Sequence, residues 1–239
     1  MIGLELRDTD ALAVAVGAGG KVSARAVAEG ADLSAAALAA LGQMPVSEIE
    51  PPAVAAIHPE APGAAAAMRA LAGRFDGSPA QAVPAASGTA AAMAEAWCGA
   101  AAGKRDVVYF AVADHAIAGV LSGGTPMVGV NRRAPAVAWL ALNPVEREDY
   151  RKAGCLEAEV AAAGIVRRFV WRIKAGDQSS VPDAAGSLAA IRLDHIFEAA
   201  RAGDGVSISV IRDTARYLGM AAANLVAVAD PEILVLGGI

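Results

Sequence analysis

Alternating and continuous apolar runs in the first third of the chain predict short strands. The pattern places strands at 2–6, 11–16 and 21–27, and the glycine-rich segment 17–20 is a strong turn signal between the second and the third. A helix is expected from Leu33 to Leu41, because Asp32 is a good N-cap and the segment is rich in alanine and leucine. A fourth short strand is expected at 53–57.

The remaining two thirds of the chain alternate between helix and strand patterns. The segment 131–153 is polar and irregular, with Pro135 and Pro144. This order of elements predicts an α/β protein with mixed sheets, and the pattern alone does not choose among several α/β folds. The expected helices are 64–75, 89–102, 156–168, 194–202 and 205–228, and the expected strands are 82–83, 106–112, 117–121 and 233–236.

Composition adds a constraint on the core. The chain has 239 residues, of which 56% are hydrophobic but only 4% aromatic, and much of the apolar content is alanine. Alanine favours helices, and each one buries little area. We therefore expect one or two domains with a helix-rich core of small, closely packed side chains.

Charge and apolar runs argue against two classes of partner. The net charge is −5, whereas affinity for nucleic acid depends mainly on Lys and Arg neutralising phosphates. The longest uncharged stretch, 77–94, contains Pro79 and Pro84 and would be a poor membrane span. The start of the chain carries charges and shows no signal peptide. We expect a cytoplasmic protein that binds neither nucleic acid nor membranes, with Cys98 and Cys155 as idle thiols.

Three motifs in the second half resemble those of the ROK family of repressors and sugar kinases. They are Gly154-Cys155-Leu156-Glu157, then Leu218-Gly219, then Asp-Pro-Glu-Ile-Leu-Val-Leu-Gly-Gly at 230–238. The resemblance implies the two-lobed actin-like ATPase fold of acetate kinase, sugar kinases, Hsc70 and actin, with lobes at 1–85 and 86–239. Relatives continue beyond the position of Ile239, so we expect either a truncated chain or a further segment outside this sequence.

The resemblance also implies two phosphate loops, and both are altered. The family's Asp-x-Gly-x-Thr matches 5–9, where only Thr9 is unchanged and Arg7 and Asp8 are unfavourable near phosphate. An ordinary solvated strand end explains this segment equally well. The family's second glycine-rich loop matches 113–119, where Gly119 remains.

In that second loop Asp114 would oppose a polyphosphate. His115 could offset this charge if protonated, could pair with Asp114, or could lie at a polar loop tip. Gly237 and Gly238 match the glycine pair that lies near the family's nucleoside. We regard Thr9, Gly119, Gly237 and Gly238 as vestigial cofactor-binding residues, and we expect ATP and Mg²⁺ only if the protein is an active kinase.

Three further positions bear on the sugar site. Ser87 stands where the family has its catalytic aspartate, and a serine without an activating partner is no base near neutral pH. Trp139 replaces the histidine of the family's sugar motif. Glu157 remains at a third sugar contact, and a helix-stabilising carboxylate in a first turn is the equal alternative. Trp139 and Glu157 are thus the candidate substrate-binding residues, and no catalytic residue is assigned.

The family's structural zinc site is also degraded. Its run of three cysteines matches residues 148–155, where Cys155 alone survives. Its histidine matches Trp139. A closed zinc site needs four ligands. We expect no metal, and a loop held by packing of Trp139, Leu140 and Tyr150 instead.

Three functions follow from these observations. The first is a ROK protein that has lost kinase activity and acts as a binding or interaction module. The second is an active ATP-dependent sugar kinase, glucokinase-like or specific for an amino sugar, with atypical site residues. The third is a transcriptional regulator, which the acidic charge and a first strand starting at residue 2 disfavour. Because the second lobe keeps the family pattern, we also expect a homodimer or a complex with a related protein, formed largely by the helices between 156 and 228.

Overall fold

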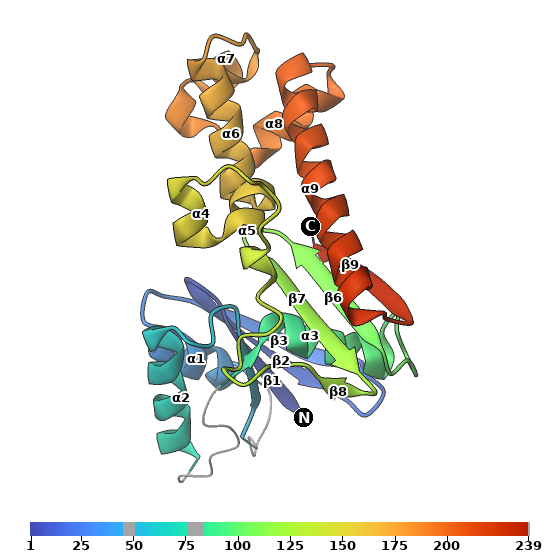
Figure 1. Ribbon diagram of the computed structural model, residues 1–239. Coiled ribbons are helices and arrows are strands. Elements are labelled where there is room, and N and C mark those ends of the chain that lie inside the picture. The colour runs from blue at the N-terminus through green and yellow to red at the C-terminus, as the bar shows by residue number, and fades with distance from the viewer. Residues whose placement is uncertain (45–50, 76–83, 239) are drawn as a thin grey trace.

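Two mixed sheets organise the chain (Figure 1). The computed structural model describes residues 1–44, 51–75 and 84–238. The first sheet has the strand order β3-β2-β1-β4-β5 and the second has the order β8-β7-β6-β9. These sheets bear out the α/β class with mixed pairing that the sequence predicts.

The first sheet combines an antiparallel meander with two parallel strands. Strands β1 (Ile2–Leu6), β2 (Asp10–Val16) and β3 (Val22–Glu29) pair antiparallel, while β4 (Ala53–Ala56) is parallel to β1 and β5 (Ala85–Ala86) is parallel to β4. Alternate residues of β1 are buried, as one face of a sheet requires. They pack with helices α1 (Leu33–Gly42) and α2 (Pro62–Arg74) in one alanine-rich core.

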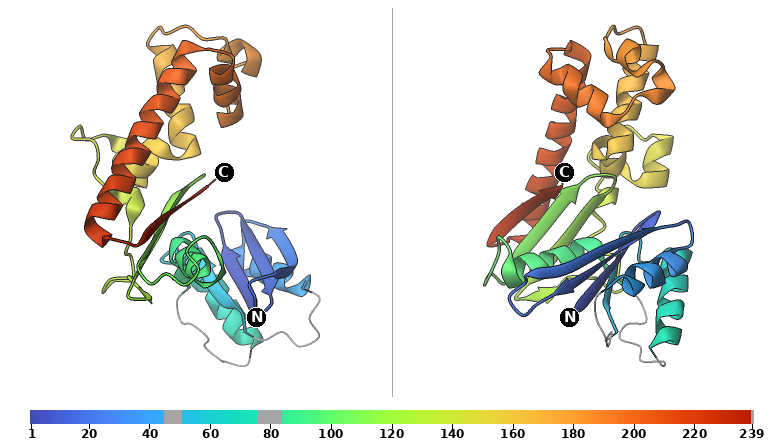
Figure 2. Two further views of the ribbon diagram at one scale, coloured as in Figure 1. Left: turned by 90° about the vertical axis from the view of Figure 1, so that its right-hand side faces the viewer. Right: turned by 180° about the vertical axis from the view of Figure 1, so that it is seen from behind.

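The second sheet is covered on both faces. Strand β7 (Ala116–Ser122) pairs antiparallel with β6 (Val107–Val112) and β8 (Thr125–Pro126), and β9 (Ile233–Gly238) lies parallel to β6. Helix α3 (Ser87–Cys98) packs on one face, and α5 (Cys155–Val160) and α9 (Gly205–Ala229) pack on the other. Figure 2 shows α3 between the two sheets, so this helix joins the halves of the molecule.

A separate helical core lies beyond the second sheet (Figure 1). Helices α6 (Ala162–Lys174), α7 (Val181–Ala185) and α8 (Leu193–Arg201) pack there against the first half of α9. Phe169, Ile196 and Val181 are its most buried large side chains. Two 3-10 turns, Val137–Trp139 and Leu188–Ala190, and helix α4 (Glu148–Ala153) complete the structure.

The expected single helix at 156–168 is wrong, because the chain breaks at Ala161. Ala161 is buried in an extended conformation, and the N–H of Ala162 donates to the carbonyl oxygen of Ala113 in the β6–β7 turn at 3.0 Å. This tertiary hydrogen bond replaces a helical one. The only sequence signal near the break is Gly164, where a side chain would overlap the carbonyl oxygen of Ala158 in α5.

Two other expectations need correction. The helix expected at 89–102 is α3, which begins at Ser87 and ends at Cys98. Just beyond its end, the carboxylate of Glu95 accepts the N–H of Ala100 at 2.7 Å. The segment expected to be irregular contains α4, which has acidic residues in its first turn and basic residues in its last, as the helix dipole favours.

Three further predictions concern a strand, the boundary between the lobes and a membrane span. The strand expected at 82–83 lies outside the described residues. The expected lobe boundary after residue 85 falls inside β5. Among the described residues, no helix is both long and apolar enough to cross a bilayer.

Candidate functional site

A cleft of about 620 Å³ opens between the two sheets. Its walls come from the end of β4, the start of α3, the β6–β7 turn, the segment 132–139 and helices α4 and α5. The cleft brings together Ser87, Trp139 and Glu157, the three positions that the resemblance assigned to the sugar site. Thr9, Gly119, Gly237 and Gly238 are not among the residues that line it.

Ser87 is the first residue of α3 and is almost fully buried, with 5% of its surface exposed. Its hydroxyl has no hydrogen-bond partner in the described part of the chain. A buried hydroxyl at a helix N-terminus lies beside backbone N–H groups that also lack helical partners. The Ser87 hydroxyl therefore has unused hydrogen-bonding capacity at this corner of the cleft.

Glu157 lies on α5 with its side chain only 14% exposed. One carboxylate oxygen accepts the N–H of Ala116 at 3.0 Å, and the other lies 3.3 Å from Nδ1 of His115. Gly154, with a φ of +89°, lets the backbone at Ala138 approach this helix closely. The Gly-Cys-Leu-Glu motif thus holds Trp139 and Glu157 at one wall of the cleft.

His115 lies between two carboxylates. Its Nε2 is 2.6 Å from Oδ2 of Asp8, and its Nδ1 faces Glu157. The hydrogen bond to Glu157 raises the pKa of His115 to about 9, with Asp8 adding to the increase and partial burial opposing it. The pairing of His115 with Asp114 that the sequence left open is not what the structure shows.

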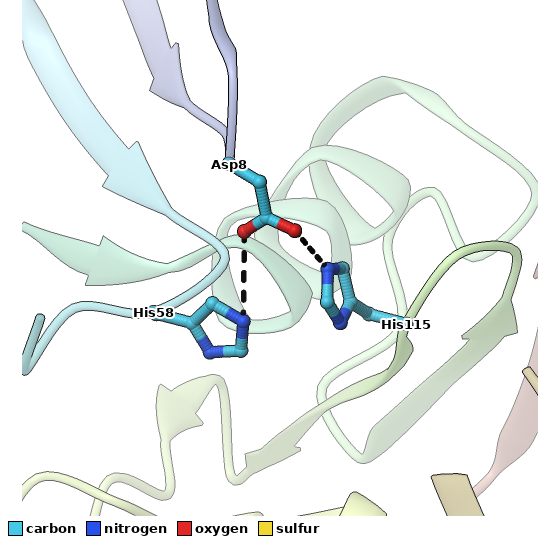
Figure 3. A group of neighbouring side chains, drawn as sticks. All are labelled: Asp8, His58 and His115. Atoms are coloured by element: carbon cyan, nitrogen blue, oxygen red, sulfur yellow. Dashed lines mark hydrogen bonds and ion pairs between the residues drawn. The ribbon is translucent and has the colours of Figure 1, made fainter. Parts of the chain in front are cut away.

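His58 completes a cluster that sequence reasoning missed. It follows β4, and its Nε2 lies 3.7 Å from Oδ1 of Asp8. The rings of His58 and His115 meet edge to face, with centroids 4.8 Å apart. Figure 3 shows both imidazoles pointing at the same carboxylate. The only sequence signal was a histidine directly after a predicted strand.

The residues expected to be vestigial cofactor contacts have other neighbours. Thr9 is exposed, and its carbonyl oxygen accepts the N–H of Gly30. Gly119 is buried within β7, where a side chain would overlap the backbone of Gly88. Gly237 lies against Tyr109, and Gly238 lies next to the backbone of Val112. Gly119 therefore serves the packing of α3 on the second sheet.

Comparison with known proteins identifies the chain's relatives. The model of the ROK family matches residues 85–239, which is more than half of the chain. The chain belongs to the ROK family. It is 29% identical over 150 residues to a glucokinase of Halalkalibacterium halodurans, covering 62% of this chain and 46% of that protein. It is also 30% identical over 148 residues to the DNA-binding transcriptional dual regulator NagC of Escherichia coli, covering 62% and 35%. This ROK chain thus spans less than half the length of these curated relatives.

The fold agrees with this membership. A ROK family glucokinase from Streptomyces griseus, solved with glucose and AMPPNP, superimposes with a TM-score of 0.79 at 21% identity, over 100% of this chain and 82% of that one. The predicted ROK-type actin-like fold is confirmed.

The residues of this ROK chain do not fit the nucleotide that the family's kinases use. Arg7, in place of a loop glycine, pairs with Glu5 at 2.9 Å and lies 3.7 Å from Asp10. Asp8 presents an exposed carboxylate from the same loop. A segment with these side chains offers a polyphosphate negative charge instead of free backbone N–H groups.

The family's structural zinc does not fit either. Cys155, the one remaining ligand type, is buried against Tyr150 and Ala158. Trp139 is 57% exposed, so the expectation that its packing holds this loop is wrong. Leu140 is partly buried against the second-sheet core, and Tyr150 is buried as expected.

A buried polar network holds the loop instead, and the sequence did not reveal it. Glu159, 1% exposed, accepts hydrogen bonds from Tyr150 and, at 2.8 Å, from Arg147, and lies 3.2 Å from Arg168. Burial and the contact with Glu159 raise the pKa of the Tyr150 phenol, which keeps it protonated as a donor. Asn143 donates to Tyr150 and Tyr217, at 2.9 and 3.1 Å.

Proposed function

We propose that this chain is a ROK protein that binds a small polyhydroxylated molecule, such as a sugar, in the interlobe cleft and does not phosphorylate it. The observation that carries the proposal is the contact between Asp8 and His115, at 2.6 Å. Asp8 belongs to the segment that resembles the first phosphate loop, and His115 belongs to the segment that resembles the second. The two segments bind each other.

Charge in this region disfavours a bound triphosphate. Asp8 and Asp114 both lie in the segments that would have to receive phosphate groups, and His115 is already shared by two carboxylates. Like charges a few ångströms apart are unfavourable by about 1 kcal/mol in water and more where water is excluded. Phosphoryl transfer depends mainly on positioning and charge neutralisation, and the carboxylates in these two segments work against both.

The residue at the position of the family's catalytic base also argues against phosphoryl transfer. The Ser87 hydroxyl has no hydrogen-bond partner among the described residues, so no neighbouring base activates it. Glu157, the candidate sugar contact on the opposite wall, is engaged by Ala116 and His115. A general base typically contributes about 10²–10⁴ in rate, so its loss alone makes turnover slow.

The cleft retains features that suit a sugar. The exposed indole of Trp139 offers an apolar face for the ring of a sugar, and Ser87 offers a buried hydroxyl. Glu60, Arg132 and Lys152 supply polar groups at the walls. A few polar groups around an apolar surface are typical of small-molecule sites.

Thermal shift assays with a panel of hexoses and amino sugars, and separately with Mg-ATP, test the proposal. A ligand that binds only the folded state raises the melting temperature. We expect an increase with at least one sugar, none with Mg-ATP, and no sugar-dependent release of ADP. Turnover of about 1–100 s⁻¹, as kinases show, would instead establish the alternative of an active sugar kinase.

Two variants sharpen this test. Trp139→Ala should abolish the sugar-dependent increase, whereas Trp97→Ala removes a similarly exposed indole that does not line the cleft and should leave it unchanged. Ser87→Asp alone should not create kinase activity, because the two altered phosphate segments remain.

A further inference from the structure

Three potential metal ligands converge at the rim of the cleft (Figure 3). One ligand atom from each of Asp8, His58 and His115 can be chosen so that all lie within 4.8 Å of one another. It is the one such group of three or more among the described residues. We propose that Asp8, His58 and His115 bind a divalent transition-metal ion. This inference goes beyond the proposed function and does not depend on it.

The distances require only small movements. Zinc bonds of about 2.0–2.2 Å to nitrogen and oxygen at tetrahedral angles place neighbouring ligand atoms about 3.4 Å apart. The two carboxylate oxygens of Asp8 divide these contacts: Oδ1 lies 3.7 Å from Nε2 of His58, and Oδ2 lies 2.6 Å from Nε2 of His115. One ligand atom from each residue can be chosen so that all lie within 4.8 Å of one another, so side-chain rotations of about 1 Å bring them to the spacing of a bound ion. The Asp8 side chain and the His58 ring are half exposed, so neither is locked by packing.

The ring nitrogen of His115 that faces away from the cluster already has a hydrogen-bond partner. Its Nδ1 faces the carboxylate of Glu157 at 3.3 Å, and Glu157 is itself fixed by the N–H of Ala116. Metal-binding histidines almost always make such a hydrogen bond through their second nitrogen, and it orients the ring. Glu157 is therefore a positioning residue that leaves Nε2 of His115 directed at the ion.

The ligand set indicates which ions bind. Two imidazoles and one carboxylate suit Zn²⁺, Co²⁺ and Fe²⁺, whereas Mg²⁺ and Ca²⁺ prefer oxygen ligands. Three protein ligands leave a fourth position open. Because His58 and His115 also line the cleft, that position is available to an oxygen atom of a cleft ligand.

The ligands come from segments far apart in the sequence. Asp8 lies between β1 and β2, and His58 follows β4, so both belong to the first sheet. His115 lies between β6 and β7 of the second sheet. An ion bound to all three would link the two sheets across the cleft and stabilise their relative placement.

The test uses the full chain after removal of metal by chelator and dialysis. Titration with Zn²⁺ is followed by calorimetry, and titration with Co²⁺ by its visible absorption, which reports coordination geometry directly. We expect one ion per chain, an increase in melting temperature with Zn²⁺, and no binding of Mg²⁺. Asp8→Asn and His58→Asn should each weaken Zn²⁺ binding at least tenfold, and Glu157→Gln by about 10–100-fold.

Matched variants exclude trivial explanations. Asp114→Asn removes an exposed carboxylate next to His115, His195→Asn removes a histidine outside the cluster, and Cys155→Ala removes the cysteine of the degraded family site. All three should bind Zn²⁺ like the unaltered protein. Absence of Zn²⁺ and Co²⁺ binding, or unchanged affinity in Asp8→Asn and His58→Asn, would show that the cluster is only an ion pair and would overturn the proposal. Both residues are exposed, so these variants should fold.

Discussion

A close backbone contact at Gly88 joins α3 to the second sheet. A side chain at this position would overlap the carbonyl oxygen of Ala118 in β7. Gly88→Ala should therefore reduce the free energy of unfolding by about 1–3 kcal/mol, because the backbone must move apart to admit a methyl group. Urea unfolding followed by circular dichroism measures the change.

Gly219→Ala is the matched control for that substitution. Gly219 also lies inside a helix, and nothing would lie within 4 Å of its new side chain. This variant should be more stable by about 0.5–1 kcal/mol, as expected for alanine in a helix. Equal effects at the two positions would contradict the role given to the contact at Gly88.

The carboxyl of Asp204 caps the N-terminus of α9. It accepts the N–H of Ser207 at 2.7 Å. Partial burial opposes its ionisation, but hydrogen bonds from Ser207, Ser179 and Ser180 outweigh this and hold its pKa below the ordinary value. A carboxyl whose pKa is lower in the folded state adds stability above its unfolded pKa, and this stability is lost as the pH falls.

Asp204→Asn tests this linkage, because asparagine caps a helix equally well without charge. The difference in unfolding free energy between the two proteins should be constant above about pH 5 and should shrink as the pH falls below about 4, where Asp204 becomes protonated. Urea unfolding at a series of pH values measures it. A difference that does not change with pH would show that the carboxylate charge is not stabilising.

At the same scale, the sequence located three residues that line the cleft and missed the cluster of Asp8, His58 and His115 at its rim. Ser87, Trp139 and Glu157 were located by their places in family motifs, and all three line the cleft. His58 and the role of Asp8 were not found, because they depend on three turns meeting in space. The order of residues along the chain does not show that these three turns lie close together in the fold.

Among the elements, α4, α5 and α6 are joined by the buried carboxylate of Glu159, and Arg168 of α6 extends the network to Thr214 of α9. Glu159→Gln should lower the free energy of unfolding by about 3–5 kcal/mol, because it leaves the largely buried Arg168 without its counter-charge, whereas Arg147 keeps Asp149 at 3.0 Å. Denaturant titration followed by tryptophan fluorescence is suitable, since Trp171 lies over Arg147 in the same region.

Glu148→Gln provides the comparison. It removes a carboxylate from an exposed pair with Lys152, and such a pair contributes about 0.3–0.5 kcal/mol. If both variants lost equally little stability, the network around Glu159 would not be what holds the loop in place of the family's zinc.

Element prediction succeeded where periodicity was local and failed where tertiary contacts decide. The strands β1, β2 and β6 were found from their apolar patterns, and α9 was found from its N-cap and length. The break at Ala161 was missed, because it results from a hydrogen bond to Ala113, which lies far away in the sequence. Helix α4 was missed because it is short and polar.

For the whole molecule, the apolar pattern indicated only an α/β protein, and the family motifs selected the fold. Those motifs lie mainly in the second half, which is also where the family model matches. The first half carries few of them, yet it forms the meander and parallel strands of the first sheet. We expect a binding function because the chain keeps the family's fold, whereas the residues that resemble its phosphate loops and catalytic base are altered.

The last prediction concerns association. We expect the chain to form a homodimer, or a complex with a related protein, that buries at least about 1,000 Å² through helices between 156 and 228. Val228, near the end of α9, exposes an apolar side chain that a second copy could cover. Val228→Glu should convert the dimer to a monomer, measured by light scattering at tens of micromolar.

Val22→Glu changes an equally apolar exposed residue on the first sheet and should leave the dimer intact. The two measurements separate a specific interface from general association, because a nonspecific effect of added charge would act at both sites. A monomeric unaltered protein would contradict the expected dimer and leave binding in the cleft as the function of the single chain.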